Sequence, residues 1–190
     1  MSVQERRERE KAQRHQLIIT TARELAEAEG WDAVTTRRLS ERIEYSQPVL
    51  YQHFSGKEAI MRAVALEGFT ELAEQLRAAR ASADSPRAAL HRIADAYLAF
   101  ALGKPALYDA MFVLSTGLAF GEPETLAPLR AAFDEFAAVV APLAGDRDPE
   151  SHAEILWSSL HGLASLTRGG RLRPEHHGQR VELLLDRFTG

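Results

Sequence analysis

The recurrence of apolar residues at helical spacing constrains this fold more than any other feature of the sequence. Nearly every stretch shows the 3.6-residue period of an amphipathic helix, and few stretches alternate as strands do. Gly30 suits the end of a first helix, and Ser85-Pro86 and Asp148-Pro149 suit helix starts further on. The sequence therefore predicts an all-α fold with about nine helices and no sheet.

The helices are expected between identifiable start and stop signals. They cover residues 11–29, 36–43, 47–54, 56–81, 85–102, 105–114, 122–143, 149–167 and 174–188. A densely charged segment, residues 1–10, precedes the first of them. The linker-like residues 82–85, with the sequence SADS, are the candidate domain boundary.

Composition bounds the class of protein. A chain of 190 residues with 45% hydrophobic and 26% charged residues is expected to fold as a globular protein. No apolar run reaches the roughly 18 to 20 residues of a membrane-spanning helix. The first ten residues lack the apolar segment of a secretory signal, and zero cysteines exclude disulfides and Cys-ligated metals. We expect a soluble cytoplasmic protein with no membrane partner, no metal and no cofactor.

The net charge of −4 is unevenly distributed along the chain. Residues 1–58 hold ten basic and ten acidic side chains, so the whole excess of negative charge lies beyond them. A neutral segment still binds phosphate when its cations gather on one face. Charge alone therefore does not decide whether the protein binds nucleic acid.

Residues 47–54, with the sequence QPVLYQHF, have the spacing of a short helix that buries only one side. At about 100° per residue, Leu50 and Phe54 share that inner side. Pro48 falls in the first turn, where a missing N–H costs no intrahelical bond. The three residues 44–46 separate this helix from the preceding one, which predicts a helix-turn-helix whose second helix lies in a DNA major groove.

The outward-facing residues of this motif are candidates for contacts with DNA. Glutamine suits base edges, tyrosine and histidine can donate to phosphate, and helix N-termini add backbone N–H groups. The candidates are Thr36, Arg37, Gln47, Pro48, Val49, Tyr51, Gln52, His53 and Lys57.

Residues 19–64 resemble the DNA-binding domain of the tetracycline-repressor (TetR) family. They contain the A-x-x-L-F/A-x-x-x-G pattern of its first helix and the T-T/V-R-x-I/L-A/S pattern of its second. The family's L-Y-x-H-F-x-x-K-E ending is present as Leu50, Tyr51, His53, Phe54, Lys57 and Glu58. The resemblance implies an all-α homodimeric transcriptional regulator, usually a repressor that a small ligand releases from a palindromic operator. It implies DNA contacts by Gln47, Tyr51 and His53 and phosphate binding by Lys57.

The resemblance also assigns the domains. It implies a charged tail at 1–10, a helix-turn-helix DNA-binding domain at 11–58, a connecting helix and linker at 59–84, and a ligand-binding and dimerisation domain at 85–190.

Two residues depart from the family pattern. The family's turn commonly contains glycine where this chain has Glu44, which would cost about 1 kcal/mol at positive φ. Val49 stands where the family often has threonine, and its methyl groups suit a thymine methyl group instead of a phosphate. The operator sequence of relatives therefore does not transfer.

The C-terminal part carries a weaker resemblance. Residues 154–166, with the sequence EILWSSLHGLASL, are similar to the Trp-x-x-x-His-Gly (WHG) helix of one branch of the family. This helix and the last one imply a four-helix dimer interface. Its candidate residues are Ser158, Gly162, Ser165, Val181, Leu184, Leu185 and Phe188.

Aromatic residues and methionine crowd the middle of the chain, including Phe120. They are consistent with an apolar effector pocket or with an ordinary bundle core. The candidate pocket residues are Tyr97, Phe100, Tyr108, Met111, Phe112, Phe133, Phe136, Trp157 and His161.

Enzymatic patterns are missing from the sequence. SGKE at 55–58 fails as a phosphate loop, no G-x-S-x-G or H-E-x-x-H occurs, and His176-His177 is an isolated pair, so we expect no catalytic residues. The charged tail is either a solvated segment or an arm that touches DNA. Three hypotheses remain in order: a ligand-responsive DNA-binding regulator, a DNA-binding regulator without a small-molecule effector, and a helical enzyme or scaffold.

Overall fold

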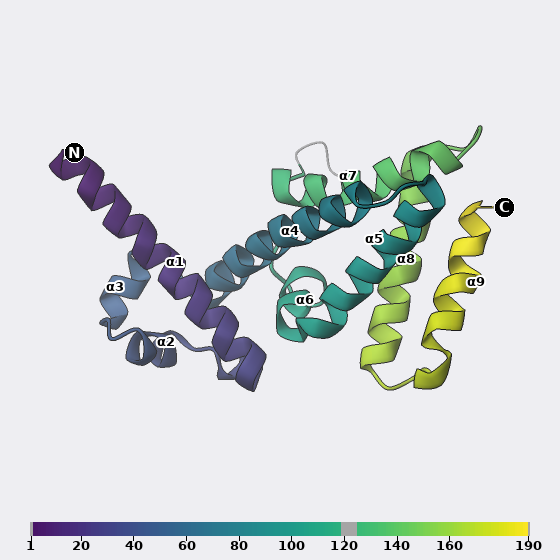
Figure 1. Ribbon diagram of the computed structural model, residues 1–190. Coiled ribbons are helices and arrows are strands. Elements are labelled where there is room, and N and C mark those ends of the chain that lie inside the picture. Colours follow the sequence, from purple (N-terminus) through teal and green to yellow (C-terminus); the bar gives the residue numbers. More distant parts are fainter. Residues whose placement is uncertain (1, 119–124, 190) are drawn as a thin grey trace. The chain divides into compact units, whose positions relative to one another are not determined.

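The computed structural model describes residues 2–118 and 125–189, which form α-helices and short 3-10 turns (Figure 1). The helices are α1 (Val3–Glu29), α2 (Thr36–Arg42), α3 (Gln47–Tyr51), α4 (Lys57–Ala81), α5 (Pro86–Gly103), α6 (Pro105–Phe112), α7 (Ala127–Val140), α8 (Pro149–Arg168) and α9 (His177–Thr189). The 3-10 turns are η1 (Trp31–Ala33), η2 (Ala141–Leu143) and η3 (Pro174–His176). The described residues contain no strand, so the all-α prediction with about nine helices is confirmed.

Two compact units make up the chain. The N-terminal unit comprises residues 1–68 and 104–119, and the C-terminal unit comprises residues 69–103 and 120–190. The division falls inside α4 and gives α6 to the N-terminal unit, so the compact units do not follow the predicted boundary at 82–85.

The N-terminal unit is built around the buried side of α1. Ile18 and Leu25 of α1, Leu39 of α2 and Leu50 of α3 are all fully buried, and Phe54 is 5% exposed. The inner side predicted for residues 47–54 is therefore the one that packs. A five-residue helix has little stability of its own, so this contact holds α3 in place.

Helix α6 joins this unit through its first turn. The Glu27 carboxylate of α1 accepts hydrogen bonds from the N–H groups of Ala106 (3.1 Å) and Leu107 (2.9 Å). The first N–H groups of a helix lack intrahelical partners and carry partial positive charge, so Glu27 caps α6 from another helix. Trp31 adds a bond from Nε1 to the Ala106 carbonyl at 2.7 Å.

Close packing of α6 on α4 depends on Gly68. A Cβ atom at this position would lie 2.6 Å from Sδ of Met111 and 2.8 Å from Cδ1 of Leu107. The missing side chain therefore lets the two helices approach.

The C-terminal unit contains the later part of α4 with α5, α7, α8 and α9. Its one strongly buried carboxylate among the described residues is Glu135 of α7, at 5% exposure. Glu135 pairs with Arg77 (3.0 Å) and Arg80 (2.8 Å) from the end of α4. Two hydrogen-bonded cations compensate the burial of this charge.

Several helix ends differ from the sequence expectation. Helix α1 begins at Val3, eight residues before the expected start, because Ser2 and Glu5 form a capping box. Helix α3 ends at Tyr51 and α6 at Phe112, earlier than expected. The expected start of the next helix at Glu122, and Phe120, lie outside the described residues, and that helix passes into η2 at Ala141.

Glu44, in the turn between α2 and α3, has φ 59°. It is the single non-glycine residue at positive φ among those described. The sequence analysis considered a positive φ at this residue, and the structure has it. A side chain in this region costs about 1–2 kcal/mol relative to the right-handed conformation.

We expect Glu44→Gly to raise the free energy of unfolding by about 1 kcal/mol, since relief of the left-handed strain exceeds the entropy that glycine adds to the unfolded chain. Chemical denaturation measures this change. Glu44→Ala is the matched control: it removes the same charge but keeps a Cβ atom, so it should give no comparable gain. A lower stability for Glu44→Gly would contradict the turn geometry.

Candidate nucleic-acid interface

A side-chain cap fixes the start of α2, whereas Ser46 makes no side-chain capping bond at the start of α3. Thr35 precedes α2, and its hydroxyl accepts from the N–H of Arg38 at 3.2 Å. The turn then closes by a bond from the N–H of Tyr45 to the Ser40 carbonyl at 3.0 Å. Ser46 precedes α3, and Pro48 lies in its first turn as predicted. The chain therefore reverses sharply and presents α3 with only one side buried.

The outer side of α3 is accessible. Gln47, Pro48 and Gln52 are exposed, Tyr51 is 52% exposed, and Val49 is half-buried. With Leu50 at 0% exposure on the opposite side, the helix offers polar and small apolar groups outward. This set can bond base edges and contact a thymine methyl group.

The N-terminus of α2 lies beside the end of α3. The hydroxyl groups of Thr36 and Tyr51 lie 3.5 Å apart, so two predicted DNA contacts are brought together. Arg37 is exposed nearby and bonds Glu41 at 2.9 Å, which raises the pKa of its guanidinium. The guanidinium group has five N–H donors, so the bond from its Nε to Glu41 leaves others for a phosphate.

His53 follows α3 and turns toward α1. Its ring lies 6.1 Å from that of His15, and the His15 ring stacks on Phe54 at 4.4 Å. Among the described residues, the buried Nδ1 of His53 has no hydrogen-bond partner. Burial lowers the pKa of His53, and electrostatic interaction with His15, Lys11 and Arg14 lowers it further.

Lys57 begins α4 and is half-buried. Its ammonium group donates to the main-chain carbonyl of Trp31 in η1. An ammonium group has three donors, so one bond fixes the side chain and others remain for a phosphate.

The candidate pocket residues divide between the two units. In the C-terminal unit Tyr97, Phe100 and Phe136 are buried, and Phe133, Trp157 and His161 are half-buried. In the N-terminal unit Tyr108 and Met111 are buried and Phe112 is half-buried. The Tyr97 hydroxyl lies 3.4 Å from Nδ1 of His161, and burial lowers the pKa of that histidine.

The candidate interface residues also differ in exposure. Ser158 and Ser165 are exposed, Gly162 and Leu184 are half-buried, and Val181, Leu185 and Phe188 are buried within the C-terminal unit. Sequence reasoning missed three exposed apolar side chains: Ile155 and Leu166 on α8, at 56% and 41% exposure, and Leu183 on α9, at 57%. The spacing of Ile155, Gly162 and Leu166 on one helix face was the available signal.

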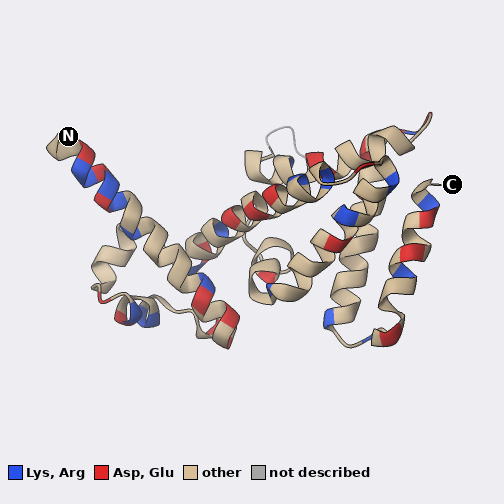
Figure 2. Ribbon diagram, viewed as in Figure 1, with Lys and Arg blue, Asp and Glu red and all other residues tan. Residues whose placement is uncertain are grey.

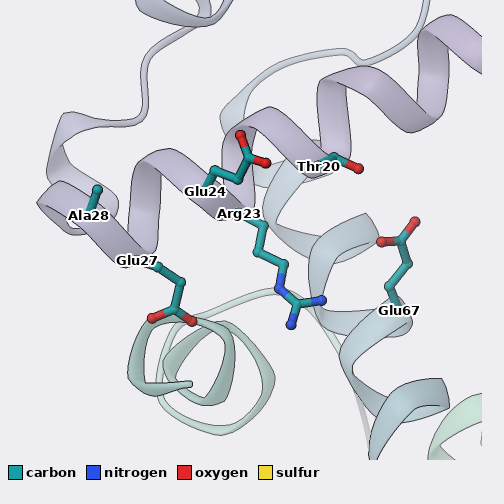
Figure 3. A pocket seen from close by; sticks show the side chains of 6 residues that line it. All are labelled: Thr20, Arg23, Glu24, Glu27, Ala28 and Glu67. Carbon is teal, nitrogen blue, oxygen red and sulfur yellow. The ribbon is translucent and has the colours of Figure 1, made fainter. Parts of the chain in front are cut away.

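Sequence reasoning also missed an open depression in the N-terminal unit, of about 590 Å³. Figure 3 shows its six lining residues on α1 and α4: Thr20, Arg23, Glu24, Glu27, Ala28 and Glu67. Glu27 already caps α6, and Glu67 accepts from Gln16 at 2.9 Å. These two carboxylates thus serve contacts within the unit.

The described residues contain no group of three or more His, Cys, Asp or Glu side chains placed to hold a metal ion. None of the helices they form combines the length and apolar character that a membrane crossing requires.

Comparisons with known proteins match both parts of the chain. Residues 18–64 match the model of bacterial regulatory proteins, tetR family, and residues 90–188 match the model of the tetracyclin repressor-like C-terminal domain. The match to the WHG helix in particular stays a prediction.

Two curated relatives are uncharacterized HTH-type transcriptional regulators. The uncharacterized HTH-type transcriptional regulator YobS of Bacillus subtilis is 33% identical over 94 residues, which is 50% of this chain and 49% of that protein. The uncharacterized HTH-type transcriptional regulator Rv0681 of Mycobacterium tuberculosis is 29% identical over 154 residues, 80% of this chain and 69% of that protein. The chain thus spans about half the length of the first relative.

Among solved structures, a protein of unknown function from Rhodococcus sp. RHA1 has a similar fold. It superposes with a TM-score of 0.76 at 26% identity and covers 92% of each chain.

For His53, we expect a pKa below 6.5 in an NMR titration of the folded protein, for the reasons of burial and nearby charge given above. The unfolded chain binds this proton more readily, so His53 contributes stability above pH 6.5 that is lost as pH falls. Lys11→Gln with Arg14→Gln should move the pKa back upward. A pKa unchanged by these substitutions would contradict the assigned position of the two cations.

Proposed function

The chain belongs to the tetracycline-repressor family of transcriptional regulators, and from that premise we propose that it is a repressor that binds a palindromic operator as a homodimer and leaves it when a small ligand binds. Family and fold make it a regulator and not an enzyme. The observation that carries the proposal is the one-sided burial of α3, which has Leu50 fully buried and Gln47, Tyr51 and Gln52 exposed.

We assign each exposed residue a DNA contact that suits the chemistry of its side chain. Gln47, at the N-terminal end of α3, bonds a base edge in the major groove, and Val49 contacts a thymine methyl group. Tyr51 and Thr36, whose hydroxyls adjoin, donate to one stretch of backbone. Lys57 and Arg37 neutralise phosphates near the N-termini of α4 and α2, where backbone N–H groups add to the attraction.

We propose that a dimer forms through α8 and α9. The apolar side chains of Ile155, Leu166 and Leu183 would be removed from water there, and Gly162 would allow close helix approach. Ser158, Ser165 and Leu184 flank these residues, whereas Val181, Leu185 and Phe188 support the helices from the core. Two copies must place their α3 helices one helical turn apart, about 34–36 Å, to read a palindrome.

We propose that residues in each of the two units take part in the response to a ligand. In the C-terminal unit, the polar pair Tyr97 and His161 lies among aromatic residues, a combination typical of small-molecule sites. In the N-terminal unit, α6 carries Tyr108, and its first turn is held by Glu27.

A ligand that displaces α6 would therefore move α1 and α4 and shift the population away from DNA-competent spacing. The alternative is a regulator without a small-molecule effector. Release of bound operator by a small molecule distinguishes the two.

To test DNA reading, we expect Gln47→Ala to weaken binding to the operator in a gel-shift titration with the chain's own promoter region. A lost base contact removes about 1–3 kcal/mol of discrimination, or about 5- to 150-fold in dissociation constant. Tyr51→Phe should weaken operator and random DNA alike, because its hydroxyl faces the backbone. Gln13→Ala, an exposed glutamine on the outer side of α1, is the matched control and should bind as wild type. If all the variants bind the operator with wild-type affinity, α3 is not the helix that contacts the bases.

To test the dimer, we expect Ile155→Glu or Leu183→Glu to convert dimers to monomers in analytical ultracentrifugation, because each places a charge in an apolar contact. Val113→Glu, at a residue 63% exposed in the N-terminal unit, is the control and should leave the mass unchanged. If all three variants stay dimeric, the interface lies elsewhere.

A further inference from the structure

Helix α1 continues well beyond the region that packs in the N-terminal unit. It begins at Val3, and the Ser2–Glu5 capping box fixes that start. The first fully buried residue is Ile18, so about four turns precede the core. The segment that the sequence predicted as a charged tail is therefore an ordered helical extension.

The buried side of α1 carries cations where it leaves the core. Ile18, Ala22 and Leu25 are all fully buried on this side. Continued toward the N-terminus with the same spacing of three or four residues, the series passes through Arg14, Lys11 and Arg7. We call these three residues the basic row.

The acidic residues of this segment lie beside the basic row and not within it. At about 100° per residue, Glu8 and Glu10 lie about 80° to either side of Ile18, and Glu5 lies further round. Glu10 forms ion pairs with Arg6 at 3.4 Å and, from the flank of the row, with Arg14 at 3.8 Å. Figure 2 shows the basic and acidic residues that occupy this half of α1. Arg7 and Lys11 are both exposed.

The basic row lies on the side of α1 that faces the end of α3. His15, next along that side, stacks on Phe54 at 4.4 Å and lies 6.1 Å from His53 by ring centres. Lys11 and Arg14 are near enough for their charge to act on the His53 imidazole. Hence the row adjoins the helix assigned to the major groove.

We propose that Arg7, Lys11 and Arg14 bind phosphates of the DNA strand that flanks the groove occupied by α3. Seven residues of helix span about 10 Å, which is about three base-pair steps of the duplex axis. Three cations on one side of a rigid helix thus match a run of backbone negative charge. This inference rests on the proposed function, because it takes α3 as the groove helix.

The test compares two double variants that remove the same charge from the same helix. Arg7→Gln with Lys11→Gln removes two members of the row, and Arg6→Gln with Arg9→Gln removes two cations from the other side. Circular dichroism and melting temperature of both should match wild type, since all four side chains are exposed. Binding to operator and to random DNA is then measured from 50 to 200 mM salt.

For the row variant we expect the slope of log K against log salt to become shallower by about 1.8, the value for two phosphates. Over this range of salt, wild type should then lose about 12-fold more affinity than the row variant. The loss should be equal on operator and random DNA, because phosphate contacts carry no sequence information. The control variant should keep the wild-type slope.

Two failures are distinguishable. If the wild type does not bind the operator, or if Gln47→Ala does not weaken its binding, both the proposed function and this inference are wrong. If wild type binds but the row and control variants have equal slopes, the proposed function stands. The inference is then overturned, and the extension is a solvated helix.

Discussion

The burial of Leu50 beneath α3 is the contact on which the rest of the interface depends. A helix of five residues cannot hold itself together in water, because too few internal hydrogen bonds repay its nucleation. Leu50 and Phe54, both inside the N-terminal unit, therefore set the rotation of α3 about its own axis. Every polar group on the opposite side takes its direction from that rotation, including those assigned to base reading.

Much of this arrangement was predictable from the sequence, since it follows from local rules. Helical spacing predicted the all-α fold, and the missing glycine at Glu44 pointed to the strained turn. What failed was the start of α1. Apolar spacing predicted a start at residue 11, and the charged Arg7 occupies the inner-side position where an apolar residue would have extended the pattern toward Val3.

Other features depend on contacts between residues far apart in sequence. The bond from Lys57 to the Trp31 carbonyl and the packing of His53 beside His15 follow from tertiary placement, which no local pattern encodes. The inclusion of α6 in the N-terminal unit likewise rests on its contacts with Glu27 and Gly68. A boundary at 82–85 divides the chain into consecutive segments, so it could not predict that α6 belongs to the N-terminal unit.

Glu27 holds α6 by its main chain, since both acceptor bonds run to backbone N–H groups at 106 and 107. These two bonds therefore do not depend on which side chains stand at 106 and 107. Substitutions there that fit the buried space around α6 would leave its link to α1 in place.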